Sequence, residues 1–145
     1  MNILIRPAAK EDFESIFNLF REFSIFQKTP EKLHITLEQL TADEKHFQCF
    51  VAVADDDIIG FATWFFAYYS WTGRAIYLDD LYVKDTHRKY GIGRRLLDTV
   101  IHHAKDNDCR SVRWLVSRWN ENAIGFYKKI GAHIDDTEIT AVLPL

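Results

Sequence analysis

The spacing of apolar positions changes several times along the chain, and each change marks a new predicted element. Over residues 10–24 apolar side chains recur three and four positions apart, which is the period of an amphipathic helix. A short apolar run over residues 3–6 predicts a strand that Pro7 ends. Residues 25–33 are predicted to form a loop, and residues 36–41 a second short helix.

The middle of the chain is typical of strands. Residues 47–54 and 58–69 are rich in β-branched and aromatic side chains, and three aspartates at residues 55–57 predict a tight hairpin turn between them. A second turn over residues 71–74 leads into a further predicted strand over residues 75–83. This part of the sheet is therefore expected to be antiparallel.

Helical spacing returns in the second half and alternates with apolar runs. The predicted elements are a helix over residues 91–107, a buried strand over 111–117, a helix over 122–129 closed by Gly131, and a final strand over 138–143. This order predicts one mixed α/β domain over residues 1–145. Its central sheet begins antiparallel and gains strand–helix–strand crossovers later.

Composition narrows the class of protein. The chain has 145 residues, 48% of them hydrophobic, and its 18 basic and 21 acidic side chains give a formal net charge of −3. This balance excludes disorder and gives no basic face for nucleic acid. The longest uncharged stretch, residues 58–73, is shorter than the roughly 20 apolar residues that cross a bilayer. No secretory leader is visible, and Cys49 and Cys109 are expected to be buried, reduced thiols, so a soluble cytoplasmic protein is predicted.

The segment over residues 86–95 carries the clearest chemical signal. Gly91 and Gly93 lie between a predicted strand and a predicted helix, where glycine allows a ligand to approach the backbone closely. The free amides at the start of that helix favour a pyrophosphate, and Arg88, Lys89 and Arg94 add positive charge. No Gly-Lys-Ser/Thr follows, and the first glycine of G-x-G-x-x-G is absent. A phosphate-bearing cofactor other than a nucleoside triphosphate or dinucleotide is therefore indicated.

Two motifs in this half resemble those of the GCN5-related N-acetyltransferase (GNAT) superfamily. Residues 88–93 match its R/Q-x-x-G-x-G/A loop, and residues 120–132 match its N-x-x-A-x-x-F-Y-x-K-x-G segment. Residues 77–83 are similar to the diamine (spermidine/spermine) and thialysine N-acetyltransferase branch. The resemblance implies the GNAT fold, a mostly antiparallel twisted sheet flanked by helices, and acetyl-CoA as co-substrate.

The resemblance also implies roles for individual residues. It assigns the pantetheine arm of acetyl-CoA to the backbone of the strand over residues 81–83 and the pyrophosphate to the amides of residues 89–94. Two residues of the second motif would border the cofactor. The positions assigned to acetyl-CoA are Leu81, Tyr82, Val83, Arg88, Lys89, Tyr90, Gly91, Ile92, Gly93, Arg94, Asn120 and Ala123. Tyr127 would be the general acid for the departing thiolate, since a phenol and a thiol have comparable basicity.

On the amine side, the resemblance points to Asp79 as the group that assists deprotonation, often through water. Asp79 and Asp80 are adjacent on a predicted strand, so their side chains are expected to leave opposite faces. The substrate-binding candidates are Phe26, Gln27, Asp79 and Asp80. Phe26-Gln27 stands where diamine enzymes carry Tyr-Glu, which removes one carboxylate, and Glu22 or Glu138 is a candidate replacement for that charge.

The sequence favours direct transfer of an acetyl group to a primary amine of a small molecule in a ternary complex. Alternatives are a protein or peptide N-acetyltransferase, a non-catalytic CoA-binding regulatory module and, least favoured, a nucleic-acid-binding module. The six histidines lack ligand spacing, so no metal site is expected. The expected partners are acetyl-CoA and a small amine, without nucleic acid or membrane, and relatives in this branch imply a homodimer.

Overall fold

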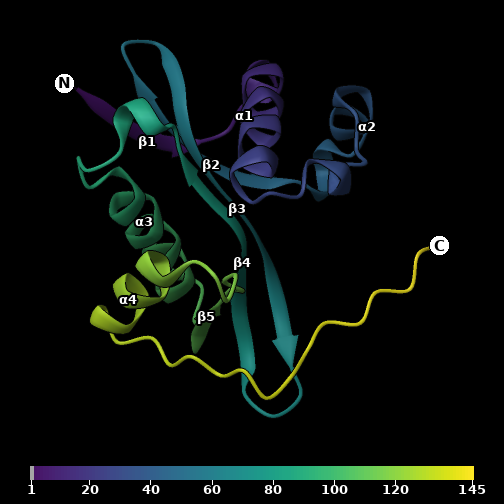
Figure 1. The fold of residues 1–145 in the computed structure, drawn as a ribbon, viewed down its shortest axis with the longest axis vertical. Coiled ribbons are helices and arrows are strands. Elements are labelled where there is room, and N and C mark those ends of the chain that lie inside the picture. Colours follow the sequence, from purple (N-terminus) through teal and green to yellow (C-terminus); the bar gives the residue numbers. More distant parts are fainter. Residues whose placement is uncertain (1) are drawn as a thin grey trace. The chain divides into compact units, whose positions relative to one another are not determined.

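The computed structural model describes residues 2–145, so residue 1 of the predicted domain lies outside the described residues. Its elements follow one another in the order β1-α1-α2-β2-β3-β4-α3-β5-α4, joined by short 3-10 turns (Figure 1). The strands are β1 Ile3–Pro7, β2 Gln48–Ala54, β3 Asp57–Tyr69, β4 Gly73–Val83 and β5 Ser111–Arg113. The helices are α1 Phe13–Phe26, α2 Leu37–Ala42, α3 Ile92–Asp106 and α4 Glu121–Lys129.

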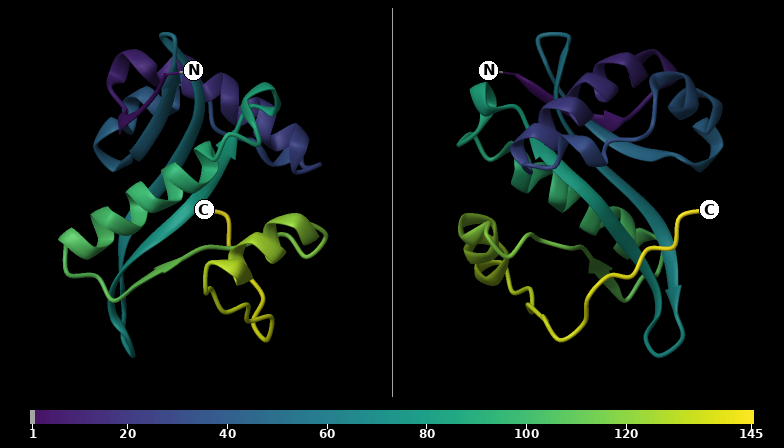
Figure 2. Two further views of the ribbon diagram at one scale, coloured as in Figure 1. Left: turned by 90° about the vertical axis from the view of Figure 1, so that its left-hand side faces the viewer. Right: turned by 45° about the vertical axis from the view of Figure 1, so that its right-hand side comes forward.

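The five strands form one sheet in sequence order. Strands β1 to β4 pair with their neighbours in antiparallel fashion, and β5 pairs with β4 in parallel. The parallel pair needs a crossover, which α3 provides between β4 and β5 (Figure 2). The predicted fold class, a mostly antiparallel sheet flanked by helices, is therefore confirmed.

Helices cover both faces of this sheet, because alternate side chains of each strand leave opposite faces. Val51 and Phe61 are fully buried in the cluster that α1 and α2 form with the sheet. Phe50 and Trp64 instead contact the ring of His103 on α3, with ring centroids 5.7 and 4.8 Å apart. Helices α1 and α3 thus lie on opposite faces of the sheet (Figure 1). Each fully buried large side chain contributes roughly 1.5–3 kcal/mol to folding.

The predicted hairpin turn at residues 55–57 is confirmed. Asp55 and Asp56 both adopt positive φ angles, 48° and 67°, between β2 and β3. Consecutive left-handed residues match the right-handed twist of the flanking strands, and aspartate tolerates this conformation better than most residues.

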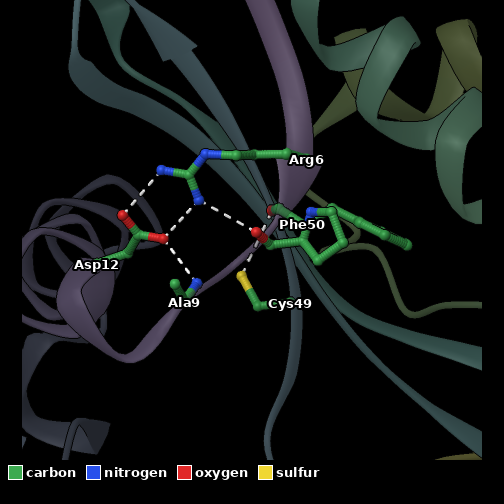
Figure 3. A network of polar contacts seen from close by, with 6 residues as sticks. Arg6, Ala9, Asp12, Cys49 and Phe50 are labelled. Carbon is green, nitrogen blue, oxygen red and sulfur yellow. Dashed lines mark hydrogen bonds and ion pairs between the residues drawn. The ribbon is translucent and has the colours of Figure 1, made fainter.

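An ion pair joins β1 to the start of α1. Both terminal nitrogens of Arg6 donate to the Asp12 carboxylate, at 2.7 and 3.0 Å, and the Ala9 amide donates to the same carboxylate at 2.7 Å (Figure 3). The hydrogen bonds from Arg6 lower the pKa of Asp12. Asp12 is one of the few buried charged residues, and these three bonds replace the water that it loses.

Some expected elements differ. Helix α1 extends to Phe26 and a 3-10 turn occupies residues 30–32, inside the predicted loop. The strand predicted over residues 111–117 ends at Arg113, because only three of its residues align with β4. It was expected to be buried, but it is half-buried to exposed. The strand predicted over residues 138–143 does not form: its β-like pattern does not specify a partner strand, and none is paired with it among the described residues.

The described chain divides into two compact units, residues 1–114 and residues 115–145. The first contains the whole sheet, and the second contains α4 and the C-terminal segment. In the part of the chain that the structure covers, no helix is both long enough and apolar enough to span a membrane.

The two cysteines differ in environment. Cys49 is buried as expected, and burial raises the pKa of its thiol to about 12, which keeps it protonated and unreactive. Cys109 is only half-buried, which corrects the expectation for that residue. It follows α3 in the turn that leads to β5, where fewer side chains cover it.

Candidate active site

The glycine loop connects β4 to α3 and ends in a left-handed residue. Lys89 has a φ angle of 71°, and Gly91, the residue before the first turn of α3, has a φ angle of 75°. Glycine adopts this conformation without the steric cost that a side chain brings. The first amides of the 15-residue helix α3 have no partner within the helix, and the positive end of its dipole lies here. The loop therefore has the properties of an anion site.

The space around the glycines is consistent with a ligand close to the backbone. A β-carbon built on Gly91 would meet no atom within 4 Å, and one built on Gly93 would meet only Val83 Cγ2, at 3.9 Å. Packing within the protein does not require glycine at residue 93. Its small size is therefore available for contact with a bound molecule.

Two basic side chains of the loop contact other residues of this chain, whereas the sequence led us to expect that their charge lies beside the pyrophosphate. Arg88 donates from Nε to the Val83 carbonyl at 2.9 Å, and its guanidinium lies over the Phe26 ring, 4.7 Å from the centroid. Arg94 pairs with Asp98 at 2.8 Å. Both guanidinium groups thus have partners within the chain, so the backbone amides at the start of α3 are the stronger candidates for binding an anion than these two side chains.

A cavity of about 270 Å³ lies between the end of α1 and the end of β4. Its lining residues are Glu22, Ile25, Phe26, Tyr82, Asp85 and Arg88. Phe26, a substrate-binding candidate, is thus in the cavity wall, and the sequence candidate Glu22 supplies a carboxylate there. Gln27, the other candidate, follows the last turn of α1 and is not among the lining residues. Asp85 is a second carboxylate in this wall, and no sequence motif indicated it.

The acidic pair lies at an irregularity in β4. The pairing of β3 with β4 shifts between Thr63 and Trp64. Asp80 is aligned with Thr63, and its amide donates to the Thr63 hydroxyl at 3.1 Å. Leu78 is aligned with Trp64, so Asp79 is an extra residue on β4. This is a β-bulge, a device that redirects side chains and is common beside active sites.

The bulge changes which face of the sheet receives Asp80. In a regular strand Leu78, Asp80 and Tyr82 would share one face. Here Leu78 is paired with Trp64, which contacts α3, whereas Tyr82 packs on the other face against Phe23 of α1, with centroids 5.1 Å apart. Asp80 lies two residues from Tyr82 in the regular part of β4, so it shares the α1 face. The simple alternation predicted for Asp79 and Asp80 does not apply at this point.

The environment of the pair disfavours two negative charges. Burial raises the pKa of Asp80 to about 7, and the negative charge of Asp79 adds to this rise. Asp79 is more exposed, but desolvation by the surrounding atoms raises its pKa as well. The carboxylates are thus close enough to interact, and Asp80 is poised to exchange a proton near neutral pH.

Residues of the second motif lie in the second compact unit. Asn120 precedes α4, and its side-chain oxygen accepts a hydrogen bond from the Ala123 amide at 3.3 Å. Tyr127 lies later on the same helix and is half-buried, and burial raises the pKa of its hydroxyl. The phenol therefore stays protonated at neutral pH, as a proton donor must be.

Thr63 is the residue of the bulge that sequence reasoning missed. It is a buried polar residue within the apolar strand β3, and its hydroxyl holds the Asp80 amide. Counting the hairpin register back from the turn places Thr63 near Asp80, but the bulge itself leaves no signal in the sequence. Among the residues that the structure describes, no group of three or more histidine, cysteine or acidic side chains is arranged to hold a metal ion.

The sequence matches the family model described as Acetyltransferase (GNAT) family over residues 13–132. It is 34% identical to the thialysine N-epsilon-acetyltransferase of Sus scrofa, covering 90% of this chain and 84% of that protein. It is 30% identical to the human spermidine/spermine N(1)-acetyltransferase-like protein 1, covering 88% of this chain and 20% of that protein. The aminoglycoside N-acetyltransferase AAC(6')-Iy, solved in complex with CoA, shares the fold with a TM-score of 0.80 at 18% identity, covering 99% and 96% of the two chains.

Proposed function

Because this chain belongs to the GNAT acetyltransferase family and is an N-acetyltransferase, we propose that it acetylates a primary amine of a small molecule. The observation that carries this proposal is the 34% identity to a thialysine N-epsilon-acetyltransferase across nearly the whole of both chains. A polyamine, a diamine or a thialysine-like amine is the proposed substrate class. The proposed route is direct transfer in a ternary complex, since neither Cys49 nor Cys109 lies in a recognised motif and Cys49 is buried and protonated.

Acetyl-CoA, the proposed acetyl donor, fits the glycine loop. When bound, it would supply the activated thioester that the amine attacks. The open space at Gly91 and Gly93 and the amides of α3 support a pyrophosphate at this position. The residues proposed to hold the co-substrate are Leu81, Tyr82, Val83, Arg88, Lys89, Tyr90, Gly91, Ile92, Gly93, Arg94, Asn120 and Ala123. For Arg88, whose guanidinium lies over the Phe26 ring, the proposed contact is through the backbone.

Two proton movements are required of the protein. The amine must lose a proton before it attacks the thioester, and the departing sulfur must gain one. Tyr127 is the proposed proton donor to sulfur, supported by its position in the second motif and by a pKa that burial raises. The acidic pair on β4 is the proposed proton acceptor, for which the sequence pointed to Asp79. Such general acid–base steps contribute typically about 10²- to 10⁴-fold each.

The amine is proposed to bind between the acidic pair and the end of α1, near Phe26 and Gln27. The carboxylates of Glu22 and Asp85 line the cavity beside Phe26, which suits a substrate with a positive charge. They offer the negative charge that Phe26-Gln27 lacks relative to the Tyr-Glu pair of diamine enzymes. Binding of a second ammonium group is therefore compatible with this sequence.

The decisive experiment follows thiol release from acetyl-CoA at about pH 8 with a panel of amines. The panel contains spermidine, putrescine, thialysine, lysine, glucosamine and a basic peptide. Turnover of one small amine at least tenfold faster than the peptide is expected. Preference for the peptide would favour protein acetylation, and silence on every amine with intact CoA binding would favour the regulatory alternative.

We further propose a cytoplasmic homodimer. The location is supported by two cysteines that are free in the structure, and the dimer by resemblance to the diamine and thialysine branch. Sedimentation of the full chain at several concentrations tests the dimer. A monomer at every concentration would contradict it.

A further inference from the structure

A second cavity, of about 450 Å³, lies at the edge of the sheet where β1 separates from β2. Strand β1 ends at Pro7 opposite Phe50, and the Ala8 amide still donates to the Cys49 carbonyl at 2.9 Å before the chain turns into α1. Among the described residues no further strand borders the start of β2 on this side. Residues of both segments line the cavity, and Ala9, Cys49 and Phe50 of its wall are labelled in Figure 3.

This cavity is separate from the proposed acetylation site. None of its lining residues lines the cavity beside Phe26, and none belongs to the glycine loop or to the acidic pair on β4. All of them lie in the first compact unit of the chain. The volume falls within the range of roughly 300–1,000 Å³ that is usual for small-molecule sites. The acetylation of an amine therefore gives this cavity no role.

Aromatic rings form much of the cavity wall. Phe13 and Phe47 meet edge to face with ring centroids 5.4 Å apart, and the Phe50 ring stacks on Trp64 with centroids 5.6 Å apart. All four residues line the cavity, as does His103 of α3, whose ring centroid lies 4.8 Å from that of Trp64. Flat apolar groups pack favourably against such rings. The wall is therefore suited to the aromatic ring of a ligand.

One residue of this wall has a hydrogen-bond donor without a partner. Trp64 is only 6% exposed and its Nε1 atom is buried, yet no group of the described residues accepts a hydrogen bond from it. A buried donor that lacks an acceptor is unfavourable and rare in folded proteins. A ligand with an acceptor oxygen would provide the missing partner.

The charged side chains at the cavity favour an anion. Lys10 and Lys45 line it from exposed positions, and Glu44 is the acidic residue of the lining. Two positive charges thus stand against one negative charge. Lysine side chains are long and flexible, so both ammonium groups can turn toward a bound carboxylate.

We propose that this cavity binds a small aromatic carboxylate. The ring of the ligand packs against Phe50 and Trp64, and Lys10 and Lys45 attract its charge. The carboxylate supplies the acceptor that the indole N–H lacks. The site is independent of the proposed acetylation, because the two share no residue.

The first test titrates 2-naphthoate into the full chain, with and without CoA. Proton–nitrogen NMR follows the indole signals of the four tryptophans, and Trp64→Phe identifies the signal of Trp64. Binding should move that signal, because the naphthyl ring packs against the indole, and the affinity should be the same in the presence of CoA. Absence of binding, an unmoved Trp64 signal or competition with CoA would each overturn the proposal.

The second test concerns the charge of the ligand. Replacing both lysines, as Lys10→Gln with Lys45→Gln, should weaken binding of 2-naphthoate about three- to tenfold, which is the range expected for two exposed ion pairs. Lys32→Gln is the matched control, since Lys32 is exposed and lies outside the cavity, and it should bind as the wild type does. The uncharged 2-naphthylmethanol should bind all three proteins equally. A double variant with wild-type affinity for 2-naphthoate would contradict the proposal.

The third test fills the cavity. Ala9 has an extended backbone, with a φ angle of −107°, which phenylalanine adopts without strain, and its amide bond to Asp12 does not involve the side chain. Ala9→Phe should therefore lose binding of 2-naphthoate while thermal unfolding and CoA affinity stay close to wild type. Ala9→Ser keeps a small side chain and should bind normally. Unchanged binding in a folded Ala9→Phe protein would place the ligand elsewhere and refute the assignment.

Discussion

Aspartate side chains in this protein show how strongly surroundings determine the chemistry of one residue type. Hydrogen bonds from Arg6 lower the pKa of Asp12, whereas burial without a cation raises that of Asp80 to about 7. The first residue is therefore fully ionised and stabilises the fold, and the second exchanges protons in the pH range where enzymes work.

Asp12→Asn should destabilise the protein by about 2 kcal/mol at pH 7, because it breaks a charge-assisted, two-pronged pair in which the Asp12 side chain is mostly buried and Arg6 is partly exposed. The folded-state pKa of Asp12 lies below its unfolded value, so this stabilisation is present above about pH 4 and is lost as pH falls. Urea unfolding at pH 7 and pH 3 should show the difference from wild type shrinking. Asp98→Asn breaks an exposed pair and should cost less than about 0.5 kcal/mol. Equal losses in both variants would contradict this account.

Tyr127→Phe should lower turnover by roughly 10²- to 10⁴-fold if the phenol is the proton donor to sulfur. Removing only the hydroxyl preserves the ring, so thermal unfolding and CoA affinity should stay close to wild type. Steady-state kinetics with the best amine of the panel measures the effect. An unchanged kcat would refute the role of this hydroxyl.

At the scale of elements, the start of α3 illustrates how a local conformation creates a binding function. The left-handed Gly91 turns the chain so that the helix begins with its amides exposed, and nothing within 4 Å of a β-carbon at Gly91 closes the space. Neither feature depends on the charges of the loop, since Arg88 and Arg94 have partners elsewhere. CoA affinity is therefore expected to depend more on glycine than on these arginines.

Gly91→Val should reduce CoA affinity by at least tenfold while the fold survives. A β-branched residue is strained at a φ angle of 75° and fills the open space, at a folding cost of roughly 1–2 kcal/mol. Gly93→Ala separates the two effects, because its φ angle is not positive and its β-carbon only touches Val83. It should be no less stable than wild type yet bind CoA more weakly. Calorimetric titration with CoA and thermal unfolding measure both; unaltered binding in Gly91→Val would exclude the pyrophosphate site.

At the scale of the whole molecule, the sheet lies entirely within residues 1–114, while the C-terminal segment follows α4 in the second unit. This segment leaves Ile139, Val142 and Leu143 at 90, 80 and 84% exposure. Large apolar side chains exposed close together in the sequence are a feature of interaction surfaces. The proposed homodimer is one structure in which they would be covered.

Hydrogen exchange should separate these regions. Amides of residues 132–145 lie outside helices and strands and should exchange within seconds in dilute protein, whereas those of β3, paired on both sides, should exchange orders of magnitude more slowly. Mass spectrometry of labelled peptides measures both. Protection of residues 138–143 equal to that of β3 would show that the segment is a paired strand, as its sequence pattern first indicated.

Most elements followed from local pattern. The helical spacing before residue 24 gave α1, the aspartates at residues 55–57 gave the hairpin turn, and Gly91 marked the start of α3, all confirmed within a few residues. Periodicity and turn chemistry are properties of neighbouring residues, so they are readable without a partner. The family motifs likewise located the candidate acetyl-CoA loop and Tyr127 from the sequence alone.

The sequence by itself determined the fold class, the family and the order of elements as far as α4, because each depends on residues close together in the chain. Only the tertiary structure decided which strands are paired and where their register shifts. The bulge that turns Asp80 toward α1, the partner of Arg88 and the short length of β5 all depend on contacts between distant segments. Such contacts form where the total packing of the sheet is most favourable, and the pattern of one strand does not contain that information.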